Sequence, residues 1–370
     1  MSIPRIARVP LTSKQPEACP HCGSHNLTRR GTRRKKLEIV QLWRCTSCKR
    51  VFTPGPAALR NRTYPLRMIL SALTDYDTGY TLEETAARLK KRTRRSVSPS
   101  TIAAWLEQYK QHCSYRRLRA KGLTRFPASQ TIRSIKLYHR QVYSFAYHRS
   151  KLELLRAGML DDKRASGTDS TARFAPVADF LENVPMACPH ELFTRDEDPK
   201  ARASQARPAF ADPANAVINR KENAATEIAA LIIPAVGNNK LRHETLQRFM
   251  LANDSVTLAV EIPIWLDEHD IGAIEREYGI ELPPVTGAHR AITGHLDFLQ
   301  VRNGAVHILD YKPDAQTNKP LAQLTIYALA LARLTGLKLF DIKCAWFNEH
   351  EYCEFFPRAL LARAREQRAA

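Results

Sequence analysis

Hydrophobic residues recur in different patterns along the chain, and each pattern predicts a different kind of structure. Residues 64–118 show the spacing of amphipathic helices, with an apolar residue every three to four positions. Residues 137–155 alternate like a strand in the middle and turn helical at the end. Residues 161–220 are rich in Asp, Ala, Pro and Arg and have little period. That composition predicts a linker or bridging region, which we place at 126–219.

From residue 221 the pattern tightens and predicts one compact α/β unit, placed at 220–358. The hairpin in this unit is expected around Arg302-Asn303-Gly304. The order helix–strand–strand–strand–helix–strand is typical of a compact α/β domain. The expected elements are two helices, a strand, a short inserted helix, the two hairpin strands, an amphipathic helix and a final strand pair, at 222–236, 241–251, 255–266, 268–279, 291–301, 305–313, 320–336 and 340–357.

Positive charge is concentrated in the first part of the chain. Residues 1–156 carry 33 Lys and Arg against 8 Asp and Glu, whereas residues 157–370 carry 24 against 29. A folded region with an excess of 25 positive charges attracts a polyanion, and nucleic acid is the obvious partner. The alternative is a basic surface that serves solubility alone.

Apolar runs long enough for a membrane span are missing from the sequence, and its first residues lack the apolar core of a signal peptide. We therefore expect a cytoplasmic, nucleoid-associated protein with no membrane partner and largely reduced cysteines.

Two C-x-x-C pairs, Cys19/Cys22 and Cys45/Cys48, are separated by a span that a hairpin can fill. Two thiolate pairs can close a tetrahedral Zn²⁺ site and stabilise a module too small to fold on its own core. We place this module at 16–56. It resembles the zinc ribbons of transposase-like DNA-binding regions. A closed four-cysteine site is structural, so we assign it no catalysis.

A basic cluster lies between the two cysteine pairs. It would occupy the hairpin tip and could contact phosphates, although a solvated loop is the alternative. Its candidate DNA-binding residues are Arg33, Arg34, Lys35 and Lys36.

A helix-turn-helix DNA-binding domain is expected at 62–125. Thr81 and Glu84 have the spacing of a capping box. Ser98 can cap a second helix with Pro99 in its first position. This helix would present Ser100 and Thr101, with Arg94 and Arg95 just before it, in the manner of a recognition helix. The pattern is degenerate, and a plain helical bundle could also produce it.

Two carboxylates and a lysine lie at the ends of neighbouring predicted strands. Adjacent antiparallel strands can bring Asp297 and Asp310 together, and period-two geometry places Lys312 on the same face as Asp310. Two carboxylates suit Mg²⁺ or Mn²⁺, which can activate water and stabilise charge on a phosphate. The alternative is an Asp–Lys pair that serves structure alone.

These residues resemble the PD-(D/E)XK nuclease superfamily, and within it the RecB-type branch. That branch has a G-x-x-D strand, a D-x-K strand and a Q-x-x-x-Y helix, matched here from Gly294 to Asp297, from Asp310 to Lys312 and from Gln323 to Tyr327. The resemblance implies a restriction-endonuclease-like α/β fold, aspartates that bind metal, a catalytic lysine, and a glutamine and tyrosine beside the active site. No Pro precedes Asp297, so the name motif is loosely kept.

A third metal ligand remains open between three residues, of which His243 is ranked ahead of Glu227 and Glu261. The resemblance implies a histidine on an upstream helix in an H-x-x-L setting, which His243 matches, and many relatives use a first-helix Glu, as at Glu227. Glu261 in the first strand is the third candidate. Some RecB-type relatives carry an iron–sulfur cluster, but the remaining cysteines lack its compact spacing and are expected to be buried thiols. They are Cys113, Cys188, Cys344 and Cys353.

We therefore expect a multidomain protein in which a zinc ribbon and helix-turn-helix precede a nuclease domain. The expected function is metal-dependent DNA cleavage linked to a mobile element, with transposition or other mobile-element proteins as partners. A non-catalytic DNA-binding regulator with a degenerate nuclease fold, or a defence or repair nuclease, are the alternatives. The cofactors would be structural Zn²⁺ and catalytic Mg²⁺ or Mn²⁺.

Overall fold

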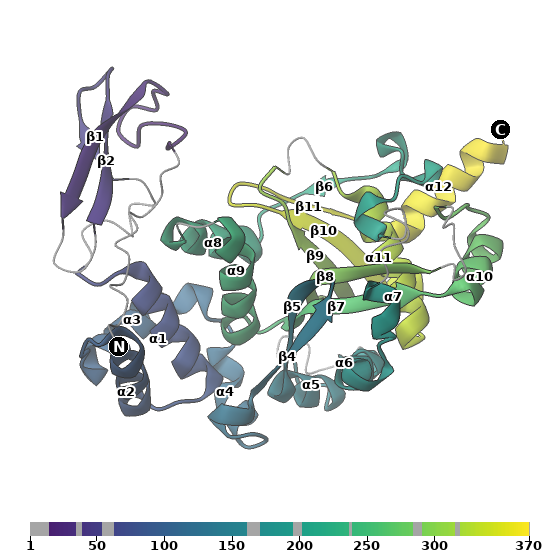
Figure 1. The fold of residues 1–370 in the computed structure, drawn as a ribbon, viewed down its shortest axis with the longest axis horizontal. Coiled ribbons are helices and arrows are strands. Elements are labelled where there is room, and N and C mark those ends of the chain that lie inside the picture. The colour runs from purple at the N-terminus through teal and green to yellow at the C-terminus, as the bar shows by residue number, and fades with distance from the viewer. Residues whose placement is uncertain are drawn as a thin grey trace. The chain divides into compact units, whose positions relative to one another are not determined.

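A computed structural model describes most of the chain as two compact units. The first unit comprises Met1–Tyr76, Tyr80–His112 and Glu227–Phe249, and the second comprises Asp77–Gly79, Cys113–Thr226 and Met250–Ala370 (Figure 1). Among the described residues, no helix is long and apolar enough to cross a membrane. The described residues are 15–34, 39–53, 63–160, 171–194, 202–236, 239–283, 291–314 and 319–369.

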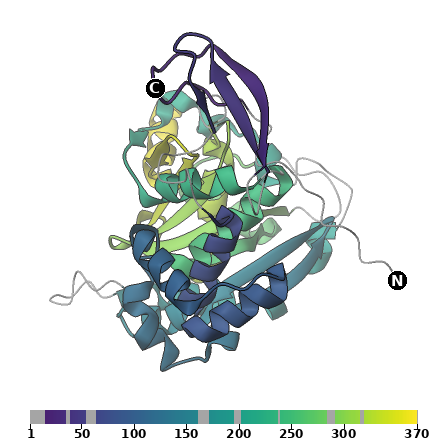
Figure 2. The same cartoon turned by 90° about the vertical axis from the view of Figure 1, so that its left-hand side faces the viewer.

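The first unit contains a three-stranded antiparallel sheet. Strands β1 (Leu27–Arg34) and β2 (Ile39–Cys45) form a hairpin, and the short β3 (Val51–Phe52) pairs with β2. Figure 2 shows the length of this hairpin. The core of the module is small, with Leu27, Trp43 and Phe52 packed against the cysteines. A core of this size does not stabilise a fold without a further crosslink or metal.

Most of the first unit is helical. Its helices are α1 (Leu66–Thr78), α2 (Leu82–Thr93), α3 (Pro99–Gln108) and parts of α8 (Ala224–Ile232) and α9 (Asn239–Asn253). Helix α2 begins with the capping box predicted from Thr81 and Glu84. Helix α3 begins at Pro99, and the Ser98 hydroxyl accepts a hydrogen bond from the Thr101 N–H at 3.2 Å. Leu89 and Ile102 are fully buried.

An eight-stranded mixed sheet forms the centre of the second unit. Its order is β4-β5-β7-β8-β9-β10-β11-β6, and all pairs are antiparallel except β9 with β10. The β8–β9 hairpin turns at Asn303-Gly304, both with positive φ, as predicted. The strands are β4 (Ile132–His139), β5 (Gln141–His148), β6 (Asn219–Arg220), β7 (Thr257–Leu266), β8 (Ile292–Arg302), β9 (Ala305–Tyr311), β10 (Ile342–Phe347) and β11 (Tyr352–Phe355).

One hydrophobic core joins this sheet to its helices. Helix α11 packs on β7, β9 and β10, and α12 packs on α11 and β10 (Figure 1). Strand β9 is buried along its whole length, as expected for a central strand. The helices are α4 (Arg116–Leu123), α5 (Arg149–Arg156), α6 (Ala175–Ala187), α7 (His190–Thr194), α10 (Glu268–Tyr278), α11 (Leu321–Thr335) and α12 (Pro357–Ala369).

The linker expected at 126–219 is corrected by the structure. Strand β5 pairs with β7, so the β4–β5 hairpin extends the sheet. Helix α6 places Val177, Phe180, Leu181 and Val184 in the same core. Their spacing is that of an amphipathic helix, but the surrounding Ala, Pro and Asp residues obscured it. Helix α4, expected in the helix-turn-helix domain, belongs to the second unit.

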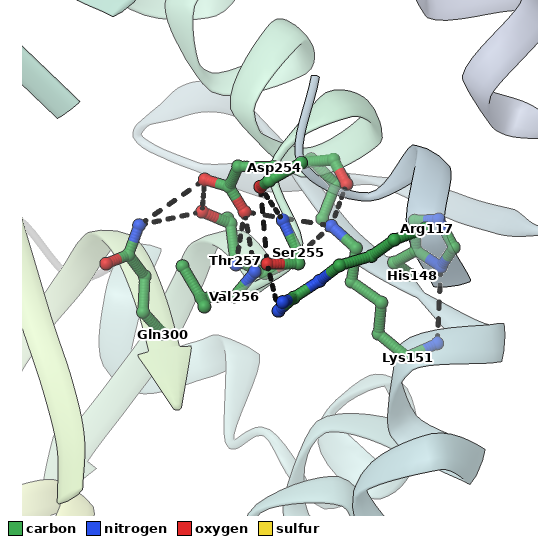
Figure 3. A network of polar contacts seen from close by, with 10 residues as sticks. Arg117, His148, Lys151, Asp254, Ser255, Val256, Thr257 and Gln300 are labelled. Atoms are coloured by element: carbon green, nitrogen blue, oxygen red, sulfur yellow. Dashed lines mark hydrogen bonds and ion pairs between the residues drawn. The ribbon is translucent and has the colours of Figure 1, made fainter. Parts of the chain in front are cut away.

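A buried lysine holds the chain where β7 begins. Lys151 on α5 is fully buried and donates hydrogen bonds to the carbonyl oxygens of Leu251 at 2.6 Å and Thr257 at 2.9 Å (Figure 3). Asp254 accepts a hydrogen bond from the Thr257 N–H at 2.6 Å, and Gln300 on β8 donates to the Thr257 hydroxyl. Burial lowers the pKa of Lys151 to about 8, against the opposing charge of Asp254. This network fixes the start of the strand that carries Glu261.

Candidate active site

The structure brings Asp297 and Asp310 together on adjacent strands. The β8–β9 ladder pairs Phe298 with Leu309, so the next position along the register places Asp297 opposite Asp310. The Tyr311 N–H donates a hydrogen bond to Oδ2 of Asp297 at 3.0 Å, which fixes that carboxylate at the β9 backbone. The two acidic groups therefore lie side by side at one point of the sheet.

Asp310 is buried, with 4% of its surface exposed, and it contacts one cation. Nζ of Lys312 lies 3.0 Å from Oδ2 of Asp310. Burial and the negative charge of Asp297 raise the pKa of Asp310 to about 7. Burial alone would lower the pKa of Lys312, but the charges of Asp310 and Asp297 outweigh it and raise that pKa.

The balance of charge at this point favours a further cation. Two carboxylates face one ammonium group, and burial together with the charge of Asp297 raises the pKa of Asp310, so that holding both negative charges there is unfavourable. Oxygen ligands of this kind are those that Mg²⁺ and Mn²⁺ prefer. The residues present therefore fit a hard divalent ion.

Helix α11 supports the strand that carries Asp297. Nε2 of Gln323 donates a hydrogen bond to the hydroxyl of Tyr327 at 3.0 Å. The Tyr327 ring is buried against Gly294, where a Cβ atom would lie 2.4 Å from Cε1 of the ring. Burial and the charge of Asp310 raise the pKa of Tyr327 above its ordinary value, so the phenol stays neutral. Gly294 and Tyr327, both singled out by sequence, are thus in direct contact.

Of the three candidates for a third ligand, Glu261 lies on the strand next to Asp297. Strand β7 pairs Val260 with Phe298 and Ile262 with Leu296, which leaves Glu261 opposite Asp297. Its φ of 54° lies in the left-handed region, which a non-glycine residue rarely adopts inside a strand. Strain of this kind gathers at functional sites.

The other two candidates, Glu227 on α8 and His243 on α9, fall in the first unit. Glu227 is exposed and His243 is half-buried. As metal ligands, both stay predictions.

A cavity of about 490 Å³ opens beside Lys312. Arg207, Lys312 and Lys319 line it together with Gln323 and one acidic residue, Asp212. Arg207 and Lys319 are exposed and lie in different loops, far apart in sequence. Their positive charge suits a phosphate chain, because cations close to a backbone position it without reading its sequence. Neither residue could be found from the sequence, since isolated basic residues in loops carry no motif.

Four cysteine sulfurs form a second cluster, in the first unit. All four lie within 4.8 Å of one another, with Sγ of Cys19 3.6 Å from that of Cys48, and Sγ of Cys22 3.6 Å from that of Cys45. Sulfurs bound at about 2.3 Å to one tetrahedral Zn²⁺ lie about 3.7 Å apart. The Cys48 N–H lies 3.5 Å from Sγ of Cys45, and this contact is the main cause that lowers the pKa of that thiol to about 6. The cluster fits a zinc ion.

The structure places the predicted DNA-binding residues at several points of the first unit. Arg33 is exposed on β1, whereas the side chain of Arg34 and all of Lys35 and Lys36 lie outside the described residues. Arg94 caps the C-terminus of α2 with φ 58°, and Arg95 follows it; both are exposed.

The first turn of α3 holds the other two. Ser100 is exposed, and Thr101 is half-buried with its hydroxyl 2.8 Å from that of Ser98. Ser98 also lies 2.9 Å from the Ser100 hydroxyl, so both side chains take part in the N-terminal cap. The helix-turn-helix interpretation remains a prediction.

Comparison with known proteins bears on the C-terminal part of the chain. The chain matches no curated protein and no solved structure. The family model of the PD-(D/E)XK nuclease superfamily matches residues 191–355, a range that includes the two aspartates, Lys312 and the Gln323–Tyr327 pair. Members of this superfamily are generally metal-dependent nucleases. The C-terminal part of this chain is therefore similar to the nucleases of the PD-(D/E)XK superfamily.

Proposed function

We propose that the protein is a metal-dependent endonuclease that hydrolyses phosphodiester bonds in DNA. The observation that carries this proposal is the contact of Asp310 with Lys312 beside Asp297, inside the range that matches a nuclease superfamily. Asp297 and Asp310 would hold Mg²⁺ or Mn²⁺, with Glu261 as the favoured third ligand. A divalent ion held there supplies Lewis-acid stabilisation of charge on the phosphate and a more acidic water.

Lys312 acts through its charge in this proposal. Because the neighbouring carboxylates raise its pKa, the ammonium group stays protonated at neutral pH. A protonated amine donates hydrogen bonds and cannot remove a proton from water. Lys312 therefore orients the attacking water or stabilises negative charge on the phosphate, and it is a poor general base.

Arg207 and Lys319 would hold the nucleic-acid backbone in the cavity beside Lys312. Gln323 and Tyr327 position β8, because the tyrosine ring packs on Gly294 while its hydroxyl accepts the hydrogen bond of Gln323. We further propose that the cysteine module holds structural Zn²⁺ and that the first unit selects or holds the DNA. A link to a mobile element, with transposition proteins as partners, is the context we propose.

The test is a cleavage assay on duplex and single-stranded DNA with Mg²⁺ or Mn²⁺. Asp310→Asn and Lys312→Met are compared with wild type, and Glu366→Gln, at an exposed position of α12, is the matched control. We expect each site variant to lose at least about 100-fold in rate, and the control to cut like wild type.

Two results would contradict the proposal in different ways. If both site variants cut like wild type, the catalytic residues are assigned wrongly. If the folded wild-type protein never cuts but binds one duplex tightly, the protein is a DNA-binding regulator with a degenerate nuclease fold. Cleavage of RNA alone would keep the site and change the substrate.

A further inference from the structure

A second group of metal-binding side chains lies in the second unit, away from the two aspartates. His139 ends strand β4, and Cys188 and His190 lie where α6 gives way to α7. One ligand atom from each of the three lies within 4.8 Å of the others. His139 and Cys188 are buried, with 2% and 6% of their surfaces exposed, while His190 reaches the surface.

The imidazole rings face one another through their nitrogen atoms. Nε2 of His139 lies 2.7 Å from Nδ1 of His190. Nδ1 of His139 lies 2.9 Å from Nε2 of His295 on β8. If Nε2 of His139 binds a metal, its Nδ1–H is left to donate to His295. Metal-bound histidines almost always have such a partner, which fixes the tautomer and the ring orientation.

An ion bound here would crosslink two segments of the chain. Helix α7 has only five residues, too few to be stable through its own hydrogen bonds. The ring of Phe193 stacks on His139 with centroids 4.2 Å apart, so α7 is attached to β4 at this cluster. A crosslink between the β4 tip and the Cys188–His190 segment would hold both.

We propose that His139, Cys188 and His190 form a second transition-metal site, for Zn²⁺. A soft thiolate with two imidazoles selects this class of ion over Mg²⁺ or Ca²⁺. Three protein ligands leave the fourth position for water on the exposed side of His190. Seating the ion requires the two imidazole nitrogens to move apart by about 0.6 Å, since two nitrogen ligands at about 2.0 Å from a tetrahedral zinc lie about 3.3 Å from one another.

This metal site does not depend on the proposed nuclease activity, but it contacts the strand that carries Asp297. Through His139, it would orient His295, which lies two residues before Asp297 on the same strand. The ring of Tyr143 also stacks on His295, with centroids 3.5 Å apart. The ion would thus stabilise β8 at His295, while the contacts with β9 stabilise the strand at Asp297. The ion would not touch the reacting groups.

Metal content of the full chain tests the proposal. The protein is purified, dialysed against Mg²⁺ buffer without zinc, and its bound zinc is measured by mass spectrometry. We expect Cys188→Ser and His190→Ala each to lose one zinc per chain relative to wild type. His190→Cys, which restores a ligand, should keep it. The matched controls His350→Ala and Cys353→Ser, at a histidine and a buried cysteine outside the cluster, should lose none.

Unchanged zinc content in folded Cys188→Ser and His190→Ala would overturn the proposal and leave a hydrogen-bonded histidine cluster. If these variants do not fold, a measurement on the wild-type protein still tests the proposal. Crystals of the wild-type protein, examined at the zinc absorption edge, should give an anomalous peak between the three side chains. A peak at the four-cysteine cluster alone would overturn the proposal equally.

Discussion

The backbone of Gly294 lies directly against the ring of Tyr327, so that a Cβ atom on Gly294 would lie 2.4 Å from Cε1 of the ring. A methyl group there must displace a buried ring that is held by Gln323. We expect Gly294→Ala to destabilise the protein by about 2 kcal/mol and to reduce cleavage, because β8 also carries Asp297. Denaturant unfolding and the cleavage rate measure the two effects.

Gly272→Ala on α10 is the matched control for this substitution. A Cβ atom there would meet only the end of the flexible Arg276 side chain, at 3.3 Å. Alanine in a helix interior should raise stability by about 1 kcal/mol. Equal effects of the two substitutions on stability would show that the packing of the Tyr327 ring does not require a glycine at Gly294.

Asp310 should make the metal-free protein less stable as the pH rises. Its pKa is raised to about 7 in the fold, so its contribution to stability is complete below the ordinary value of 3.8 and is lost as the pH rises through about 7. Asp310→Asn stays neutral at every pH. We expect it to stabilise the metal-free protein by about 1–3 kcal/mol at pH 8 and by little at pH 4.

Denaturant unfolding at the two pH values, without Mg²⁺ or Mn²⁺, measures this difference. Added Mn²⁺ should then raise the unfolding midpoint of wild type more than that of Asp310→Asn, because binding to the native state adds stability. A variant that is less stable than wild type at pH 8 would contradict the argument from burial.

Two substitutions of Glu261 separate the effect of backbone strain on stability from the effect of the carboxylate on cleavage. Because its φ is 54°, glycine suits the position better than alanine. We expect Glu261→Gly to be about 1 kcal/mol more stable than Glu261→Ala, while both variants lose cleavage if the carboxylate is a metal ligand. If either variant retained cleavage, Glu261 would not be a metal ligand, and His243 and Glu227 would remain as the candidates.

Arg94 and Arg95 should contribute to DNA binding through phosphates. Replacing both with Ala should weaken binding across all sequences. It should also reduce the slope of log affinity against log salt by about 1.8, or about 0.9 for each phosphate contact. The matched control removes two exposed cations of the second unit, Lys338 and Arg363. A double variant with an unchanged slope would place the DNA contacts elsewhere.

The four-cysteine module should lose its fold when its metal is lost. Its core is little more than Leu27, Trp43 and Phe52 around the cysteines. The free energy of folding of this module therefore comes from the free energy of metal binding. We expect Cys45→Ser to expose Trp43, with red-shifted fluorescence and faster proteolysis between residues 16 and 56. The rest of the chain should stay resistant, and a Cys45→Ser variant with native Trp43 fluorescence would argue against a metal-dependent fold.

The local features of this protein follow from short-range patterns in its sequence. The strand at Ala305–Tyr311, the hairpin turn at Asn303-Gly304 and the capping box at Thr81 each depend on residues only a few positions apart. The meeting of Asp297 and Asp310 was likewise expected, because they lie on adjacent antiparallel strands joined by a short turn.

Those short-range patterns do not predict which strands far apart in the sequence pair with one another. The β4–β5 hairpin joins the sheet through β7, more than a hundred residues later, and its own sequence does not show which strand edge it will cover. For the same reason Arg207 and Lys319 meet beside Lys312, and His139 meets His190 and His295, without any spacing that predicts it. The sequence by itself determined the carboxylate pair, its lysine and the cysteine pairs, because their partners are local. Only the tertiary structure decided which distant residues surround them, because burial of the shared core selects those neighbours.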